Sequence, residues 1–504
     1  MPILIKNGLV YDGTGTAPVK RDILVERKRI VKIGETLKAV RVSEVIDATG
    51  AFVVPGFVDV HSHSDHNLSI FSDPEQEECV REGITTIVGG NCGKSLVPFA
   101  PRILKTLSDW EAGFSSLSVD WVTARDFFAS LYKKGLGVNF GTLIGLGTLR
   151  AFTNRGSLQD FTDVELQFAK KILEDSFRAG ALGFSSGFEY ADECGVSARE
   201  VDEYIRIVKQ FDGVYAVHLK NSESGMPHAL RETVSLAKKY GVRAEISHFI
   251  PDEEHLSEYA EGLAYIEEEG SALEIHFDVS PLGTRAFSVS AFLPKWVKEE
   301  GYDALMRHIS SPHMRERILS HMKTLPFHKI RIIRATSPSG FLVGKKISDF
   351  AESLHVDGAR AILKLMEISA GTALCAFENV SLDAYLPFVR SPYSIVASHS
   401  AGTGLRENIS GSERGVFSKF LSRAYEETAV PFEKIIMKCT SIPARKYKIG
   451  KRGMLREGYY ADIAVLRDFV PSDVFVNGSC VLHEGKPTHA RSGHILKKKE
   501  NTLL

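Results

Sequence analysis

Eight short apolar runs recur through the middle of this 504-residue chain, and they restrict its fold more than any other feature. The runs are largely continuous rather than alternating, which is typical of parallel strands buried on both faces. They lie at residues 53–60, 84–88, 138–144, 180–184, 213–217, 243–246, 273–277 and 395–397. Amphipathic stretches separate several of them, for example 163–177, where Thr162 ahead of Glu165 is a helix-start signal. The pattern predicts an α/β chain whose strands close into a TIM-like (β/α)8 barrel.

The two chain ends follow a different pattern from the middle. Short β runs separated by turns fill the first fifty or so residues, and similar runs return near the C-terminus around the turn Asn477-Gly478. We therefore predict a small β-sandwich domain built from both chain ends, residues 1–55 and 447–490. The barrel domain would occupy residues 56–446.

Two further segments do not fit a simple barrel. Between predicted strands seven and eight, the interval from about 284 to 343 is too long for a single helical connection, which predicts an insertion. Residues 491–504 form a basic tail that contains Lys497, Lys498 and Lys499. We expect this tail to be solvated and frayed.

Composition excludes several classes of function. Charged residues make up 25% of the chain and the formal net charge is -1, so nothing predicts binding to nucleic acid or to an acidic membrane surface. No run of about 18 apolar residues predicts a membrane span, and residues 1–8 are too short and strand-like for a secretory signal. The six cysteines are scattered, which is typical of reduced thiols. We expect a cytoplasmic protein with a small-molecule substrate and leave the oligomeric state open.

Histidines and one cysteine follow the predicted strands at the point where each strand ends. His61 and His63 end the first strand, and residues two apart in a strand point to the same side. Cys92 follows the second strand. Further histidines follow the fifth, sixth and eighth strands, namely His218, His248 and His399. Because the C-terminal strand ends of such a barrel meet on one face, we expect one thiol and five histidines around a single rim.

This set of side chains predicts a metal site. Neutral imidazole and thiolate are both good zinc ligands, and zinc lowers the pKa of bound water toward neutrality, so that hydroxide can attack an amide carbonyl. Any single histidine is more often an ordinary core or rim residue, and Cys92 could instead be a nucleophile in its own right. A cysteine in a glycine-rich turn that faces several histidines is better explained as a ligand.

Several motifs near these strand ends form a series. Pro55-Gly56 leads the first strand to His61-Ser62-His63, and Asn91-Cys92-Gly93 follows the second strand. Other segments of the series lie at 83–86, 180–187, 214–218, 246–248, 342–345, 440–444 and 458–462. With these motifs the chain resembles the amidohydrolase superfamily and, within it, the D-aminoacylase (N-acyl-D-amino-acid deacylase) family. The resemblance covers almost the whole chain and implies a barrel hydrolase that cleaves the amide bond of an N-acyl-D-amino acid.

The resemblance also implies roles for the rim residues. One zinc ion would be held tightly by Cys92, His218 and His248. His61 and His63 would form a second, weaker metal position with an aspartate that ends strand eight. In the family that aspartate also carries the proton from the attacking water to the leaving amine. We therefore expect one tightly bound zinc ion, with the second weak or absent.

The chain departs from the family's pattern at several of these positions. His399 replaces the strand-eight aspartate; it could do the acid/base work, join the metal ligands, or mark the loss of the proton carrier. Ile250 occupies the position of a lysine in the family. The segment Ser280-Pro281-Leu282 occupies the position of the family's Tyr-Pro-Tyr segment. Those family groups hold the substrate's carboxylate, so we do not expect the pocket to hold an ordinary N-acyl-D-amino acid in the usual way.

Other residues are candidates for the missing contacts. Lys220 and Arg150 could meet an anion, although both could equally be structural, and Ser280 takes the place of the family's first strand-seven tyrosine. Asp65 and Asp278 lie near strand ends and could orient the ligand histidines through outer hydrogen bonds. Asp278 could also stand in for the absent base.

Three functions stay open at this point. The first is a zinc-dependent amidohydrolase that cleaves a linear amide C–N bond, most like an N-acyl-D-amino-acid deacylase, with His399 as its acid/base group. The second is hydrolysis of a cyclic amide or a lactone by the same metal with different substrate anchors. The third is a catalytically silent barrel that binds a metal or a metabolite. The first is our prediction.

Overall fold

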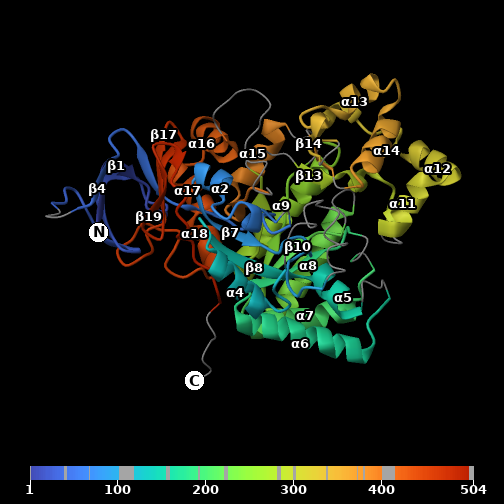
Figure 1. Cartoon of the computed structure of the whole chain (residues 1–504), viewed down its shortest axis with the longest axis horizontal. Coiled ribbons are helices and arrows are strands. Elements are labelled where there is room, and N and C mark those ends of the chain that lie inside the picture. Colours follow the sequence, from blue (N-terminus) through green and yellow to red (C-terminus); the bar gives the residue numbers. More distant parts are fainter. Residues whose placement is uncertain are drawn as a thin grey trace.

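The computed structural model describes most of the chain. The described residues are 2–38, 42–66, 68–100, 119–154, 159–190, 193, 195–220, 225–251, 253–280, 285–298, 302–335, 339–371, 373–377, 381–399 and 415–498. Figure 1 shows a central body of strands and helices with a separate sheet at one end and a helical unit at the other.

Eight parallel strands form the centre of the molecule, as the apolar runs predict. Their order in space follows their order in the sequence. The strands are β6 (Phe57–Asp59), β7 (Ile84–Gly89), β8 (Asn139–Gly145), β9 (Gly183–Gly187), β10 (Val214–His218), β11 (Arg243–Ile246), β12 (His276–Val279) and β16 (Ser394–Val396). All residues of these strands except His276 are buried, because side chains fill the barrel on one face and helices cover the other. The predicted parallel barrel is confirmed, and it is nearly closed.

The first and last barrel strands meet through Asp59 at the end of β6. Its carboxylate accepts hydrogen bonds from the Ser398 amide at 3.0 Å, the Ser398 hydroxyl at 2.5 Å and the His61 amide at 3.2 Å. The His399 amide then donates to the His61 carbonyl at 3.0 Å. These bonds fix the end of β16 against the end of β6, and they bring His61 and His399 side by side.

The first predicted strand, 53–60, is divided in the structure at Gly56. Residues before Gly56 form β5 (Phe52–Pro55), which belongs to the sheet of the chain ends, and β6 begins after it. A side chain at Gly56 would collide with Thr85, since a Cβ there would lie 2.2 Å from its methyl group. An apolar run gives no sign of this division, because both halves are buried.

Helices surround the barrel, as the amphipathic stretches predict. They include α4 (Ala124–Lys134), α6 (Asp163–Ala179), α7 (Ala198–Gln210), α8 (Met226–Tyr240), α9 (Leu256–Leu273) and α16 (Val416–Glu427). Helix α6 begins at the expected cap: the Thr162 hydroxyl accepts from the Glu165 amide, and the Glu165 carboxylate accepts from the Thr162 amide. Among the described residues, every helix is too short or too polar to cross a lipid bilayer.

Both chain ends contribute strands to one nine-stranded sheet. Its N-terminal strands are β1 (Ile3–Val10), β2 (Val19–Glu26), β3 (Arg29–Gly34), β4 (Glu44–Asp47) and β5, and its C-terminal strands are β17 (Ile463–Arg467), β18 (Val470–Val476), β19 (Ser479–His483) and β20 (Lys486–Pro487). The two ends join where β5 pairs with β17 in antiparallel fashion. The packing of this sheet as a sandwich and the domain boundaries stay predictions.

A separate unit lies between β12 and β16. Its antiparallel strands are β13 (Arg285–Ser288), β14 (Ile330–Arg334) and β15 (Leu374–Phe377), and its helices include α11 (Tyr302–Ser310), α12 (Pro312–Met322), α13 (Ile347–Ser353) and α14 (Gly358–Ile368). It has its own core around Ile332, Met366 and Cys375. The unit extends beyond the predicted end near residue 343, because β15 is the central strand that pairs with both others. Figure 1 places it away from the terminal sheet.

The basic tail is not frayed over its described part. The Gly493 amide donates to the Leu136 carbonyl at 2.7 Å, and Ile495 forms a bridge with Phe140 of β8. The Lys498 amide then donates to the Gly180 carbonyl at 3.0 Å. The expectation of a frayed tail is wrong as far as residue 498, because backbone pairing of this kind depends on partners far away in the sequence, although the tail residues stay exposed or partly exposed.

Replacing Asp59 by alanine is expected to destabilise the barrel. Without the carboxylate, the buried Ser398 donors and the His61 amide lose their acceptor, which should lower the free energy of unfolding by about 3 kcal/mol. Thermal unfolding of the metal-free protein, followed by circular dichroism, measures the loss. Asp175→Ala is the control, because its carboxylate is half exposed and its ion pairs contribute little. Equal unfolding temperatures for the two variants would contradict this role of Asp59.

Candidate metal centre

The predicted rim residues do come together at the C-terminal ends of the barrel strands. His61 and His63 follow β6, Cys92 follows β7, and His218 is the last residue of β10. His248 and His399 follow β11 and β16. Three of these residues, Cys92, His248 and His399, have the left-handed backbone conformation, with φ of 51°, 39° and 54°. Such conformations cost free energy in residues other than glycine and are concentrated at functional sites.

The Cys92 thiol lies at the centre of this cluster. Its Sγ atom is 3.3 Å from Nε2 of His61 and 3.9 Å from Nε2 of His248. Nε2 of His248 is in turn 2.8 Å from Nδ1 of His218. Two groups of possible ligands share the Cys92 thiol: one adds His218 and His248, and the other adds His61 and His63. Within each group, the three ligand atoms all lie within 4.8 Å of one another. A thiol with nitrogen donors at this spacing fits zinc, which prefers sulfur and nitrogen ligands.

Asp278 lies behind the histidines at the end of β12. One of its carboxylate oxygens is 2.9 Å from Nδ1 of His61, and the other accepts the His248 amide at 2.7 Å and makes a short contact with Nε2 of His399. The rings of His61 and His399 stack with centroids 4.4 Å apart. One buried carboxylate thus contacts three of the rim histidines, which is the geometry that an orienting carboxylate requires.

Burial controls the protonation of these groups in the metal-free protein. It lowers the pKa of His61 to about 4, and it holds the pKa of His63 and of His248 well below the ordinary value. Burial, with the nearby Asp278 and Glu193 carboxylates, raises the pKa of the Cys92 thiol well above its ordinary value. The rings are therefore neutral and ready to bind a cation, whereas the thiol must release its proton when a metal binds.

The carboxyl of Asp278, unlike the neutral rings of His61, His63 and His248, is held in its charged form. Burial alone would raise its pKa, but the adjacent His399 and His61 rings outweigh burial and hold the pKa well below the ordinary value. Asp278 is therefore ionised, and it supplies a fixed negative charge at the edge of the cluster.

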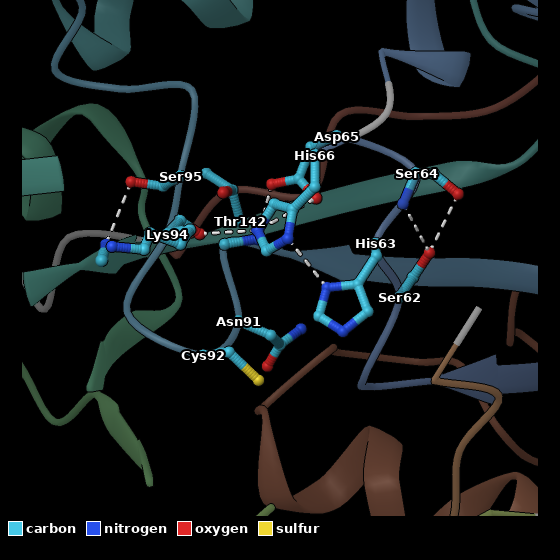
Figure 2. Close-up of polar contacts among 12 residues, drawn as sticks. Ser62, His63, Ser64, Asp65, His66, Asn91, Cys92, Lys94, Ser95 and Thr142 are labelled. Atoms are coloured by element: carbon cyan, nitrogen blue, oxygen red, sulfur yellow. Dashed lines mark hydrogen bonds and ion pairs between the residues drawn. The ribbon is translucent and has the colours of Figure 1, made fainter. Parts of the chain in front are cut away.

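A sixth histidine, His66, contacts His63 from outside the cluster (Figure 2). Nδ1 of His63 lies 2.9 Å from Nδ1 of His66, and Nε2 of His66 lies 2.8 Å from the Lys94 carbonyl oxygen. Asp65, predicted to orient a ligand histidine, instead accepts the Gly90 amide at 2.7 Å. Its carboxylate is 3.8 Å from His66, so it acts on the turn that carries Cys92 rather than directly on His61 or His63.

The three residues predicted to contact the substrate lie in different surroundings. Arg150, on α5 (Leu146–Asn154), is buried, and its guanidinium donates to Glu200 at 2.5 Å and to the Gln159 carbonyl at 2.9 Å. This pairing corrects the prediction for Arg150, because its charge is already matched by a buried carboxylate. Lys220 is exposed, and Ser280 is buried at the end of β12. Both stay predictions as substrate contacts, and Leu282 lies outside the described residues.

Sequence reasoning missed the carboxylates that follow β9. Oε2 of Glu189 lies 3.0 Å from Nε2 of His218, and the ring of Tyr190 packs against the His218 ring with centroids 5.1 Å apart. Glu193 is fully buried, and its carboxylate accepts the Gly187 amide at 2.6 Å. Acidic residues in a loop are common, so their sequence alone gives no sign of these contacts. The one available signal is Gly187, which marks a close approach of two loops.

The comparisons with known proteins agree with this geometry. A model of the amidohydrolase family matches residues 52–481, which include every barrel strand and every candidate ligand. The chain belongs to the amidohydrolase family. The protein is therefore an enzyme, a hydrolase.

Its similarity to individual members extends over nearly the whole chain. D-aminoacylase from Alcaligenes xylosoxydans xylosoxydans is 25% identical across 98% of this chain and 97% of its own length. N-acyl-D-aspartate deacylase from the same organism is 27% identical across 94% of this chain and 86% of its own length. The solved structure of N-acyl-D-glutamate deacylase from Bordetella bronchiseptica, complexed with zinc and a phosphonate inhibitor, has a TM-score of 0.81 at 24% identity and covers 98% of this chain and 99% of that one. This structural similarity shows the same fold.

The depressed pKa of His61 predicts how acid affects the metal-free protein. In the folded protein His61 stays neutral down to about pH 4, because its pKa is lowered from 6.5 to about 4, whereas in the unfolded chain it gains a proton near pH 6.5. Its contribution to the free energy of unfolding therefore falls as the pH drops from neutral toward 4. Relative to His61→Asn, the wild type is expected to lose about 3 kcal/mol over this range. Chemical unfolding of the chelator-treated proteins at each pH measures the difference. His228→Asn, at an exposed position, should follow the wild type; a His61→Asn variant that also follows it would contradict the prediction.

Proposed function

We propose that this protein is a zinc-dependent amidohydrolase that converts an N-acyl-D-amino acid and water into a carboxylate and a D-amino acid. One observation carries the proposal: the Cys92 thiol and ring nitrogens of His218 and His248 lie within 4.8 Å of one another at the mouth of the barrel. The similarity to three deacylases of acyl-D-amino acids, each across 94% or more of this chain, supports the choice of substrate.

Cys92, His218 and His248 would hold the zinc ion. When bound, zinc lowers the pKa of a water molecule toward neutrality and polarises the substrate's carbonyl. The three residues reach it from three different strand ends, so the barrel itself fixes their spacing. His61 and His63 would offer a second and weaker position, which shares the same thiol.

His399 would carry the proton in place of the family's strand-eight aspartate. It would accept a proton from the attacking water and deliver it to the nitrogen of the leaving amine. Two features support this role: its ring stacks on His61 at the rim, and its Nε2 atom contacts the ionised Asp278. A carboxylate on one ring nitrogen fixes the orientation and tautomer of the imidazole, which general acid/base work requires.

A different substrate class is the second candidate. Ile250 is fully buried where the family has a carboxylate-binding lysine, so that position cannot supply a cation to an acyl-amino acid. Lys220 and Ser280 are the proposed replacements. A cyclic amide or a lactone need not carry a free carboxylate, and a substrate without one would not need the missing lysine.

Purified protein is expected to hold about one tightly bound zinc ion per chain. Cys92→Ser should lose it, because a hydroxyl is a much poorer zinc ligand than a thiolate, and hydrolysis should fall with the metal content. Elemental analysis and a panel of N-acyl-D-amino acids, hydantoins and lactones measure both properties. Cys480→Ser is the matched control, since that thiol lies in the terminal sheet. Zinc-loaded protein that hydrolyses only hydantoins or lactones would contradict the deacylase assignment.

Replacing His399 by alanine is expected to lower kcat by about 100-fold while the zinc content stays unchanged. His399→Asp should recover part of the rate, because it returns a carboxylate to the end of β16. Steady-state kinetics with metal analysis of each variant tests this, and His228→Ala on the protein surface is the control. Unchanged kcat in His399→Ala would contradict the proton-carrier role, and loss of zinc in that variant would instead make His399 a ligand.

A further inference from the structure

One contact at the rim has a role that the amidohydrolase assignment does not supply. We propose that Glu189 is a positioning residue that presents Nδ1 of His218 to the zinc ion. The proposal rests on the proposed function, since it concerns how a ligand of the same site is held. It concerns a carboxylate in the loop after β9, the fourth barrel strand.

The two nitrogens of His218 have separate partners. Nε2 lies 3.0 Å from Oε2 of Glu189, whereas Nδ1 lies 2.8 Å from Nε2 of His248. A neutral imidazole has one N–H donor and one acceptor nitrogen. An ionised carboxylate can only accept hydrogen bonds. The contact with Glu189 therefore places the proton of the His218 ring on Nε2. The lone pair then lies on Nδ1, the nitrogen that faces Nε2 of His248.

The loop that carries Glu189 is built to hold it in place. The Tyr190 amide donates to the Gly187 carbonyl at 2.9 Å, and the Glu193 amide donates to the Tyr190 carbonyl at 3.0 Å. The buried Glu193 carboxylate accepts the Gly187 amide at 2.6 Å and so closes the loop upon itself. Glu189 therefore extends from a loop with fixed ends, and its side chain is 29% exposed beside the site.

Close contact with the turn that carries Cys92 fixes this loop relative to the cluster. A Cβ atom at Gly187 would lie 2.6 Å from the Cys92 carbonyl oxygen, and one at Gly93 would lie 1.9 Å from the Glu193 carboxylate. Only glycine permits backbones to approach this closely. The place of the loop that carries Glu189 is thus set by its contact with the turn that carries the thiol.

Asp278 holds His61 in the corresponding way from the other side of the cluster. It contacts Nδ1 of His61, which leaves Nε2 facing the thiol, the reverse of the arrangement at His218. The two carboxylates thus leave different nitrogens of the two rings on the side of the cluster, Nε2 of His61 and Nδ1 of His218. The two carboxylates differ in exposure, since Asp278 beside His61 is fully buried and Glu189 beside His218 is partly exposed.

Zinc affinity tests this role without depending on catalysis. Glu189→Gln keeps the size of the side chain and Glu189→Ala removes it, and we expect Kd for zinc to rise about 10-fold and about 100-fold respectively. Competition with a chromogenic chelator measures Kd. The thiolate-to-cobalt absorption band of the cobalt-loaded protein reports whether the geometry at Cys92 has changed. Unfolding of the metal-free variants, which should match the wild type, excludes a general loss of structure.

Glu232→Gln is the matched control, because Glu232 also pairs with a histidine, His228, but on the exposed surface of α8. Its zinc affinity should equal that of the wild type. If both Glu189 variants bind zinc within about twofold of the wild type, Glu189 has no positioning role and the inference fails, while the proposed function stands. If the wild type binds no zinc at all, the proposed function fails and the inference fails with it.

Discussion

The carboxylate of Asp278 is the group on which the arrangement of the rim depends. A buried charge is costly unless it is paired, and this one is surrounded by His61, His399 and the His248 amide, which come from three other strand ends. The rings keep it ionised, and it keeps the rings in fixed orientations. Asp59 ties the end of β6 to the end of β16 through Ser398. Two carboxylates on different strands therefore hold the nearly closed barrel and the candidate ligands with one set of hydrogen bonds.

The chemistry lies where the regular hydrogen bonding of the barrel ends. Cys92, His248 and His399 follow their strands in left-handed conformations, and their side chains lie together at the barrel mouth. Such conformations persist because the surrounding contacts determine them, including the Asp65 bond to the Gly90 amide and the Asp278 bond to the His248 amide. The strained residues are thus held by carboxylates that do not themselves lie in the predicted ligand set.

Much of this could be predicted from the sequence, for physical reasons that differ between elements. The barrel strands were predictable because parallel strands buried on both faces are continuously apolar. The rim histidines followed from their positions at strand ends. The division at Gly56 was not predictable, because the strands on either side are equally apolar.

Pairings between distant residues were also beyond the sequence. From the sequence, Arg150 is predicted to be available to an anion because it follows a strand end. In the structure it pairs with Glu200, which lies fifty residues further along the chain. Glu189 is one acidic residue in a loop, and its role depends on how that loop folds back against the turn at Cys92. Contacts of this kind are decided by packing, which local periodicity does not encode.

The charges at the rim bear on how many cations the proposed site would bind. The Cys92 thiolate, Asp278 and Glu189 would supply three negative charges. One zinc ion would leave a small negative excess, and a second would reverse its sign. In the family's pattern a strand-eight aspartate adds a further negative charge, and His399 occupies that position here. Loss of that carboxylate would weaken the Coulomb attraction for a second cation more than for the first, because the aspartate belongs to the second position. The same replacement that would change the proton carrier would therefore also favour a site with a single tightly held metal ion.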